Sequence, residues 1–195
     1  MGRKGCGTFE IVITGRASHA GLEPELGVNA LTEAAHQVLA IAALDRPGVG
    51  TSVTPTVASA GTASNVVPAS ATVVVDVRVE SADEKARVEA GFAALTPRLE
   101  GAKVEVRGGI HRPPMPESAA ADLFAVAERL LPGVAGVAVG GGSDGNLTAA
   151  VGVPTLDGLG AVGGGAHADH EYLLVESMVE RAGLVTGLVK AIRGF

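Results

Sequence analysis

The chain has 195 residues, of which 47% are hydrophobic and 18% are charged, and its net charge is −6. This composition is typical of a globular protein, and an acidic balance without a basic cluster disfavours nucleic acid or an anionic membrane as the main partner, leaving small molecules and proteins. The lone Cys6 excludes an internal disulfide and fits a cytoplasmic location, and no apolar run has the length of a transmembrane helix.

Residues 1–110 alternate between strand and helix patterns. Phe9, Ile11 and Ile13 recur at every second position, as in a strand, and the S-x-x-E spacing of Ser81 and Glu84 predicts the start of a helix. We expect, in chain order, a strand over 8–15, a helix over 26–44, strands over 51–60 and 69–80, a helix from Ser81 to about 99, and a short strand at 104–106. The order β-α-β-β-α-β is that of a ferredoxin-like α+β fold, in which two helices cover one side of an antiparallel sheet.

The segment HRPPMPES at 111–118 contains three prolines, and it predicts a domain boundary. Beyond it the pattern is that of a parallel α/β layer. The expected elements are a helix over 117–131, a strand over 134–139, a short helix from Ser143, a strand over 153–157 and a long final helix. Such sheets usually hold more strands, so we expect this half to be the C-terminal part of a larger α/β domain. The abrupt start of the chain in a strand predicts that it begins within a longer protein.

The stretch GGGAHADHEY at 163–172 places His167 and His170 three residues apart. A zinc enzyme needs at least three protein ligands, so this pair alone indicates a metal site weakly. The alternative is a polar loop in front of a helix. The glycines favour a loop that presents a side chain into a cleft.

Four further features are ambiguous when each is taken alone. The run GGGSDGN at 140–146 follows a predicted strand and opens a helix, so it is either an anion-binding turn, including a weak dinucleotide-type match, or a tight turn that needs glycine. His19 is either a surface histidine or a catalytic group, and Asn65 is either a turn former or a ligand-binding amide. Arg78 is either a solvated strand residue or a bidentate carboxylate binder.

Four motifs in order resemble the zinc-dependent aminoacylase/carboxypeptidase family of metallopeptidases, in particular its glutamate carboxypeptidase-like branch. They are GRASHAGLEPELGVNALTEAA at 15–35, GTASNVVPASATVVVDVR at 61–78, GGGSDGN at 140–146 and GGGAHADHEY at 163–172. The resemblance covers nearly the whole chain. It implies a lid and dimerisation domain over 7–110, followed over 111–195 by the C-terminal part of the catalytic domain, whose N-terminal part is absent.

The resemblance also implies roles for single residues. His19 corresponds to the lid histidine that reaches the partner subunit and stabilises the oxyanion, and His167 corresponds to the last zinc ligand. The groups that correspond to the binding site of the substrate carboxylate are Asn65, Arg78, Gly141, Gly142 and Ser143. The remaining ligands of the family's two zinc ions and its general base precede the lid, and nothing in this chain matches them.

The resemblance therefore predicts a homodimeric zinc hydrolase, of which this chain is a part that is inactive alone. The complete enzyme would remove a C-terminal glutamate-like residue from a peptide or deacylate an N-acyl amino acid. A non-catalytic dimerisation or binding module is the alternative, and nucleotide binding through GGGSDG is a third interpretation.

Overall fold

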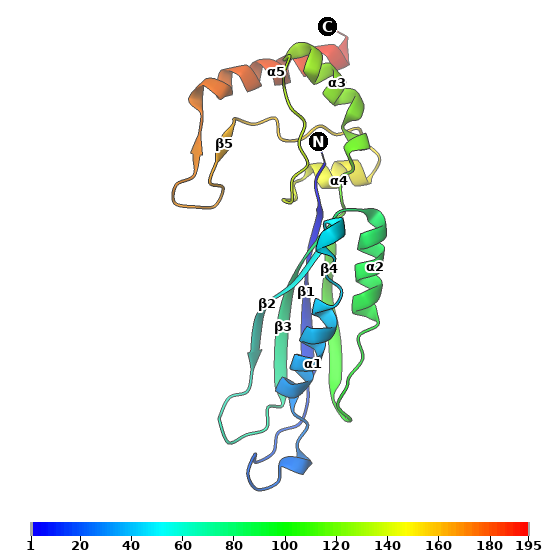
Figure 1. Cartoon of the computed structure of the whole chain (residues 1–195), viewed down its shortest axis with the longest axis vertical. Coiled ribbons are helices and arrows are strands. Elements are labelled where there is room, and N and C mark those ends of the chain that lie inside the picture. The colour runs from blue at the N-terminus through cyan, green and yellow to red at the C-terminus, as the bar shows by residue number, and fades with distance from the viewer. Residues whose placement is uncertain (1, 195) are drawn as a thin grey trace. The chain divides into compact units, whose positions relative to one another are not determined.

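The computed structural model describes residues 2–194 and divides into two compact units (Figure 1). The sheet unit comprises Lys4–Pro114 with Gly140–Gly142, and the helical unit comprises residues 2–3, Met115–Val139 and residues 143–194. No helix among the described residues is both long and apolar enough to cross a membrane.

The sheet unit is built on a four-stranded antiparallel sheet of order β2-β3-β1-β4 (Figure 1). Its strands are β1 (Gly5–Thr14), β2 (Ser52–Ala60), β3 (Ser70–Val79) and β4 (Lys103–Arg112). Helix α1 (Ala30–Ala42) follows β1, and α2 (Ala82–Ala93) follows β3. The predicted β-α-β-β-α-β order and the ferredoxin-like class are therefore confirmed.

The two helices cover the same face of the sheet, α1 over β2 and β3 and α2 next to β4 (Figure 1). Alternate residues of β3 are fully buried beneath them, as the period-two pattern predicts, and Phe9 of β1 stacks on Phe92 of α2 with ring centroids 3.8 Å apart. Burial of these apolar side chains is the main force that holds the helices to the sheet.

The predicted helix boundaries need correction. Helix α1 begins at Ala30 rather than 26, because the Asn29 side chain accepts hydrogen bonds from the amides of Leu31 and Thr32 and caps the helix. Upstream of this cap lies a 3-10 turn, η1 (Pro24–Leu26). Helix α2 ends at Ala93 rather than 99, since Pro97 cannot continue a helix. Strand β4 is longer than predicted.

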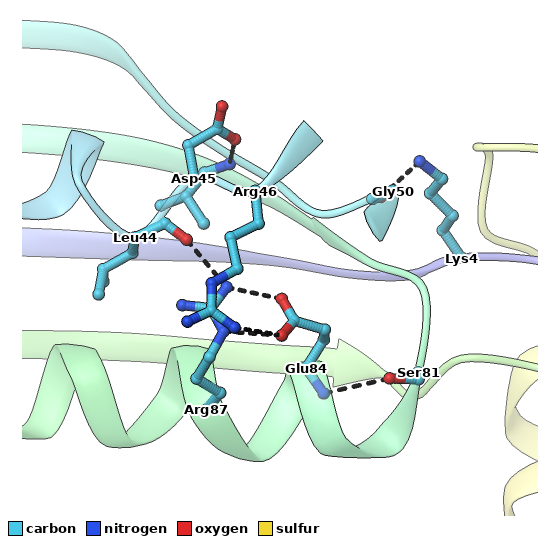
Figure 2. Close-up of polar contacts among 9 residues, drawn as sticks. Lys4, Leu44, Asp45, Arg46, Gly50, Ser81, Glu84 and Arg87 are labelled. Atoms are coloured by element: carbon cyan, nitrogen blue, oxygen red, sulfur yellow. Dashed lines mark hydrogen bonds and ion pairs between the residues drawn. The ribbon is translucent and has the colours of Figure 1, made fainter. Parts of the chain in front are cut away.

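Figure 2 shows the polar contacts between the start of α2 and the turn that follows α1. The Ser81 hydroxyl accepts from the Glu84 amide at 3.2 Å and caps α2, as predicted. The Glu84 carboxylate does not return this bond but binds Arg87 at 2.6 Å and Arg46 at 3.4 Å. Arg87 also donates to the Leu44 carbonyl at 2.9 Å. The hydrogen bond from Arg87 lowers the pKa of Glu84 to about 2, so this carboxylate is charged at neutral pH.

The helical unit is held together by α3 (Ala121–Leu130) and α5 (Val175–Arg193), whose contact buries Ala127, Leu184 and Leu188. The remaining elements of this unit are η3 (Glu117–Ala119), α4 (Gly145–Ala150), and the short antiparallel pair β5 (Gly163–Gly164) and β6 (Tyr172–Leu173). The sheet unit contains one further 3-10 turn, η2 (Pro47–Val49), after α1.

The helices predicted for this half are present, but the predicted strands over 134–139 and 153–157 are wrong. Val139 makes one isolated bridge, to Arg3, and the other residues of both segments join no ladder among the described residues. A strand needs a neighbouring strand for its backbone hydrogen bonds. An alternating or β-branched sequence favours an extended backbone but does not provide that neighbouring strand. The helical unit also leaves large side chains exposed on α5, including Val179 at 79% and Ile192 at 62%.

Candidate functional site

Two loops at one end of the sheet unit bring His19 and Asn65 close together. Their backbones pair directly, because the Ala20 amide donates to the Asn65 carbonyl at 2.9 Å and the Val67 amide donates to the Ser18 carbonyl at 2.9 Å. His19 itself forms an isolated antiparallel bridge with Val66. Both candidate side chains are exposed. The fold therefore places these two residues on one paired, solvent-facing surface.

The local backbone determines which nitrogen of the His19 ring can act as a donor. Its Nδ1 accepts hydrogen bonds from the amides of Gly21 and Leu22, each at 3.1 Å. A ring nitrogen that accepts carries no proton, so the neutral imidazole keeps its proton on Nε2. His19 thus presents an N–H donor toward solvent, which is the group that oxyanion stabilisation requires.

Arg78 lies near the opposite end of the same sheet. It pairs with Cys6 of β1 and Ser52 of β2, whereas Ser70 at the other end of β3 adjoins the His19 and Asn65 loops. Arg78 lies eight positions after Ser70 on β3, a length of about 26 Å. One copy of the chain therefore does not bring Asn65 and Arg78 to the same carboxylate.

The Arg78 side chain is held by Asp76, a residue that the sequence reasoning missed. Nε and Nη2 of Arg78 donate to the two carboxylate oxygens of Asp76 at 2.9 and 3.0 Å. This hydrogen bonding raises the pKa of Arg78. A guanidinium bound side-on in this way still offers the donors of Nη1 to a second carboxylate. The alternation along this strand could have indicated the Asp76–Arg78 pair, because residues two apart on a strand share a face.

The glycine run at 140–146 leads into a polar cluster of the helical unit. The Ser143 amide donates to Asn146 Oδ1 at 2.8 Å, and its hydroxyl donates to Asp157, which also pairs with Arg3. Burial raises the pKa of Asp157, but its hydrogen bonds from Ser143, the Gly158 amide and Arg3 outweigh this effect and leave the pKa lowered. The Ser143 hydroxyl is thus committed within the protein. Arg3 and Asp157 were not identified from the sequence, and no motif marks them.

His167 occupies the loop between β5 and β6 with a left-handed backbone, φ 66°, and its side chain is exposed. Its amide donates to Glu171 Oε2 at 3.3 Å. A non-glycine residue with positive φ is uncommon and often marks a functional loop. Among residues 2–194, no group of three His, Cys, Asp or Glu side chains could hold a metal ion. His167 could therefore supply one ligand, but the described residues do not by themselves fit a zinc site.

Comparisons with known proteins agree with the architecture of the sheet unit. Residues 1–101 match a family described as the peptidase dimerisation domain. Carboxypeptidase G2 of Pseudomonas sp. (strain RS-16) is 32% identical over 207 residues, which cover 97% of this chain and 48% of that protein. The indole-3-acetyl-aspartic acid hydrolase of Enterobacter agglomerans is 42% identical over 107 residues, 51% of this chain and 24% of that protein.

Among solved structures, the aminopeptidase PepT of Bacillus cereus superposes with a TM-score of 0.74 at 24% identity. The match covers 97% of this chain and 52% of that structure, and at this identity it shows a common fold. The chain spans about half the length of carboxypeptidase G2 and about half of the PepT structure.

Proposed function

The chain belongs to the M20 family of metallopeptidases, whose peptidase dimerisation domain it carries, and we propose that the whole protein is a zinc-dependent hydrolase that cleaves an amide bond beside a free carboxylate. The substrate is either a peptide with a C-terminal glutamate-like residue or an N-acyl amino acid. One relative is named as a carboxypeptidase and another as a hydrolase of an acyl-aspartate, which supports an acidic amino acid next to the scissile bond. In this proposal residues 7–110 form the lid and 111–195 belong to the catalytic domain.

The observation that carries this proposal is the orientation of the His19 ring. Its Nδ1 is held by the amides of Gly21 and Leu22 at 3.1 Å, so Nε2–H is the outward donor. A donor fixed in this way stabilises the negative charge on the oxygen of a tetrahedral intermediate without reorganising during the reaction. Arg78, oriented by Asp76, binds the substrate carboxylate with its remaining donors.

The separation of the two ends of the sheet supports a homodimer. His19 and Asn65 lie at one end and Arg78 lies about 26 Å away along β3, so a substrate bound to Arg78 of one copy needs His19 and Asn65 of the other. This is the arrangement expected of a dimerisation domain that contributes residues to its partner's site. The assignment of Gly141, Gly142 and Ser143 to the substrate pocket stays a prediction.

Zinc is characteristic of this family, and we propose it as the cofactor of the whole protein. When bound, zinc supplies a water that is acidic enough to ionise near neutral pH. His167 provides one imidazole ligand in this proposal. The described residues contain no group of three His, Cys, Asp or Glu side chains that could hold a metal ion, so the other ligands come from the rest of the whole protein. Calorimetric zinc titration of the wild type and His167→Ala tests this role without an activity measurement. Equal zinc affinity of the two would refute it.

The lack of a complete set of metal ligands among the described residues favours a second function for the chain by itself. A chain with one candidate zinc ligand and a dimerisation domain can act as a non-catalytic dimerisation or binding module. Sedimentation together with hydrolysis assays separates the two functions, because a module of this kind dimerises and cleaves nothing.

The decisive experiment measures hydrolysis of N-acyl-glutamate, N-acyl-aspartate, N-acyl-leucine and a dipeptide by the zinc-loaded whole protein. We expect the acidic N-acyl substrates to be cleaved most efficiently. His19→Gln should lower kcat by about 100- to 1,000-fold, the usual loss for one oxyanion donor, whereas Arg78→Lys should mainly raise KM because it loses bidentate binding. His111→Gln, an exposed histidine of β4, is the matched control.

Two results would contradict the proposal. One is the absence of cleavage of any of the four substrates by zinc-loaded protein, and the other is an equal loss in His19→Gln and in His111→Gln.

A further inference from the structure

The segment between β1 and α1 contains three glycines, and packing accounts for two of them. A Cβ at Gly15 would lie 2.0 Å from the Val28 carbonyl oxygen, and a Cβ at Gly27 would lie 2.5 Å from the Ser18 hydroxyl oxygen. A side chain at either position would force its neighbours or the backbone to move. The fold therefore requires glycine at both of these positions.

Gly21, the remaining glycine of this segment, is not required by the fold. Its φ lies outside the left-handed region, so its backbone is compatible with an L side chain. Among the described residues other than its two chain neighbours, a Cβ at Gly21 would meet only two atoms within 4 Å. Both belong to the His19 ring, Cε1 at 3.7 Å and Nδ1 at 3.8 Å, and both distances are ordinary van der Waals contacts. The structure thus leaves an open space beside the His19 ring.

This space lies next to the donor atom of His19. The Cε1 atom is bonded directly to Nε2, which carries the outward N–H because Nδ1 accepts from two backbone amides. In the proposed reaction Nε2–H binds the oxygen of the scissile carbonyl at about 2.9 Å. The carbonyl carbon and its two substituents lie just beyond that oxygen, so one substituent comes close to the space at Gly21.

The acyl group is the substituent that lacks an assigned contact. The other substituent of the scissile carbonyl is the amino acid, whose carboxylate the proposed function assigns to Asn65 and Arg78. An open space next to a reacting carbonyl admits substituents up to the size that it can hold. The space at Gly21 is thus available to the acyl group, and it limits how large that group can be.

The residues around Gly21 indicate the chemistry of that group. Residues 20–27 contain two glutamates and no basic residue, and like charges repel, so this segment disfavours an anionic acyl group. Leu22 follows Gly21 directly, and its apolar side chain is 75% exposed. An uncharged, apolar acyl group fits these surroundings.

We propose that Gly21 is a specificity-determining residue, whose missing side chain admits a bulky, uncharged acyl group beside the N–H donor of His19. This inference rests on the proposed function and deepens it, because it names the residue that sets the size limit for the acyl group. A side chain at position 21 would occupy the space and leave room for small acyl groups only.

Two substrates and two substitutions of increasing size test this assignment in the zinc-loaded whole protein. N-acetyl-glutamate and N-isovaleryl-glutamate differ only in the acyl group. We expect the wild type to cleave the isovaleryl substrate at least as efficiently as the acetyl substrate. Gly21→Val should lower kcat/KM for the isovaleryl substrate by about 10- to 200-fold, the range for one mismatched methylene, and should change it far less for the acetyl substrate. Gly21→Ala should give an intermediate loss.

Gly48 supplies the matched control. A Cβ at Gly48 would also meet open space, but this residue lies in η2, outside the candidate site. Gly48→Ala and Gly48→Val should therefore leave the ratio of the two kcat/KM values unchanged. Urea unfolding of the full chain gives a readout without hydrolysis. Because replacing a glycine of ordinary backbone conformation lowers the entropy of the unfolded chain, Gly21→Ala should keep or raise the urea midpoint.

Four results would overturn the inference. They are a clear fall of the urea midpoint in Gly21→Ala, a wild-type preference for the acetyl substrate, equal losses for both substrates in Gly21→Val, and the same change of selectivity in Gly48→Val. A wild type that cleaves neither substrate would contradict the proposed preference for acidic N-acyl substrates, and this inference with it. Cleavage by Gly21→Val with unaltered selectivity would refute the inference and leave the proposed function intact.

Discussion

The buried carboxylate of Glu33 joins α1 to the loop in front of β4, and its removal should destabilise the sheet unit. Glu33 is 0% exposed. It accepts from the Arg98 amide at 2.9 Å, from the Leu99 amide at 2.7 Å and from Gln37 Nε2 at 2.6 Å. Glu33→Gln keeps the shape of the side chain but replaces one acceptor oxygen with a donor. The two amides bind Oε2 and Gln37 binds Oε1, so in either orientation of the new side-chain amide at least one of these three donors faces another donor.

The magnitude follows from these bonds. A hydrogen bond to a charged group contributes about 1.5–3 kcal/mol, and a buried donor left without an acceptor costs about 1–3 kcal/mol. We therefore expect Glu33→Gln to lower the free energy of unfolding by about 2–3 kcal/mol. Burial raises the pKa of Glu33, but its hydrogen bonds from Gln37 and from the amides of Leu99 and Arg98 outweigh this and leave the pKa lowered. The carboxylate thus contributes stability above its unfolded pKa and loses it as the pH falls through the folded value.

Urea unfolding followed by circular dichroism measures the loss, and amide hydrogen exchange locates it. Exchange at Arg98 and Leu99 should accelerate in Glu33→Gln more than exchange in the centre of β3. Glu100→Gln, an exposed glutamate of the same loop, is the control and should change neither quantity. A loss below about 0.5 kcal/mol, the range of ordinary surface substitutions, or unchanged exchange at these two amides would refute the reasoning.

Two further substitutions test the local physics of the sheet unit. The hydrogen bond from Arg87 lowers the pKa of Glu84 to about 2, so Glu84→Gln should cost about 1 kcal/mol at pH 7 after solvent screening. That difference should disappear between about pH 4.5 and 2, and pH-dependent urea midpoints check it. A Cβ at Gly7 would lie 2.1 Å from the Gly109 carbonyl oxygen, so Gly7→Ala should cost about 3 kcal/mol in thermal unfolding. Gly48→Ala, with open space around it, should not.

The sequence predicts the sheet unit well because its signals are local. The alternation along β3 and the Ser81 cap each depend on neighbouring residues, so the pattern and the structure agree. Residues 134–139 and 153–157 carry a similar signal without forming strands. Whether such a segment becomes a strand depends on a hydrogen-bonding neighbour elsewhere in the chain, which no local pattern contains.

For the candidate site too, the sequence reveals the local features but not the distances that depend on strand pairing. The residue types at His19, Asn65 and Arg78 are visible in the sequence, and so is the motif order that groups them. The antiparallel pairing of β1 with β3 places the loop of Asn65 beside that of His19, whereas Arg78 lies at the other end of β3. The pairing of Asp76 with Arg78 lay within reach of the sequence, since only one residue separates them.

The central position of β1 has a consequence for synthesis on the ribosome. Of the four strands of this sheet β1 is made first, yet its partners are β3 and β4, and Thr14 pairs with Lys103. At about 5–20 residues per second, β1 waits several seconds before its second neighbour emerges. During that time its apolar face and one edge have no native cover. The nascent chain therefore passes through an interval in which binding by a chaperone competes with aggregation, and slower translation of residues 80–112 would lengthen it.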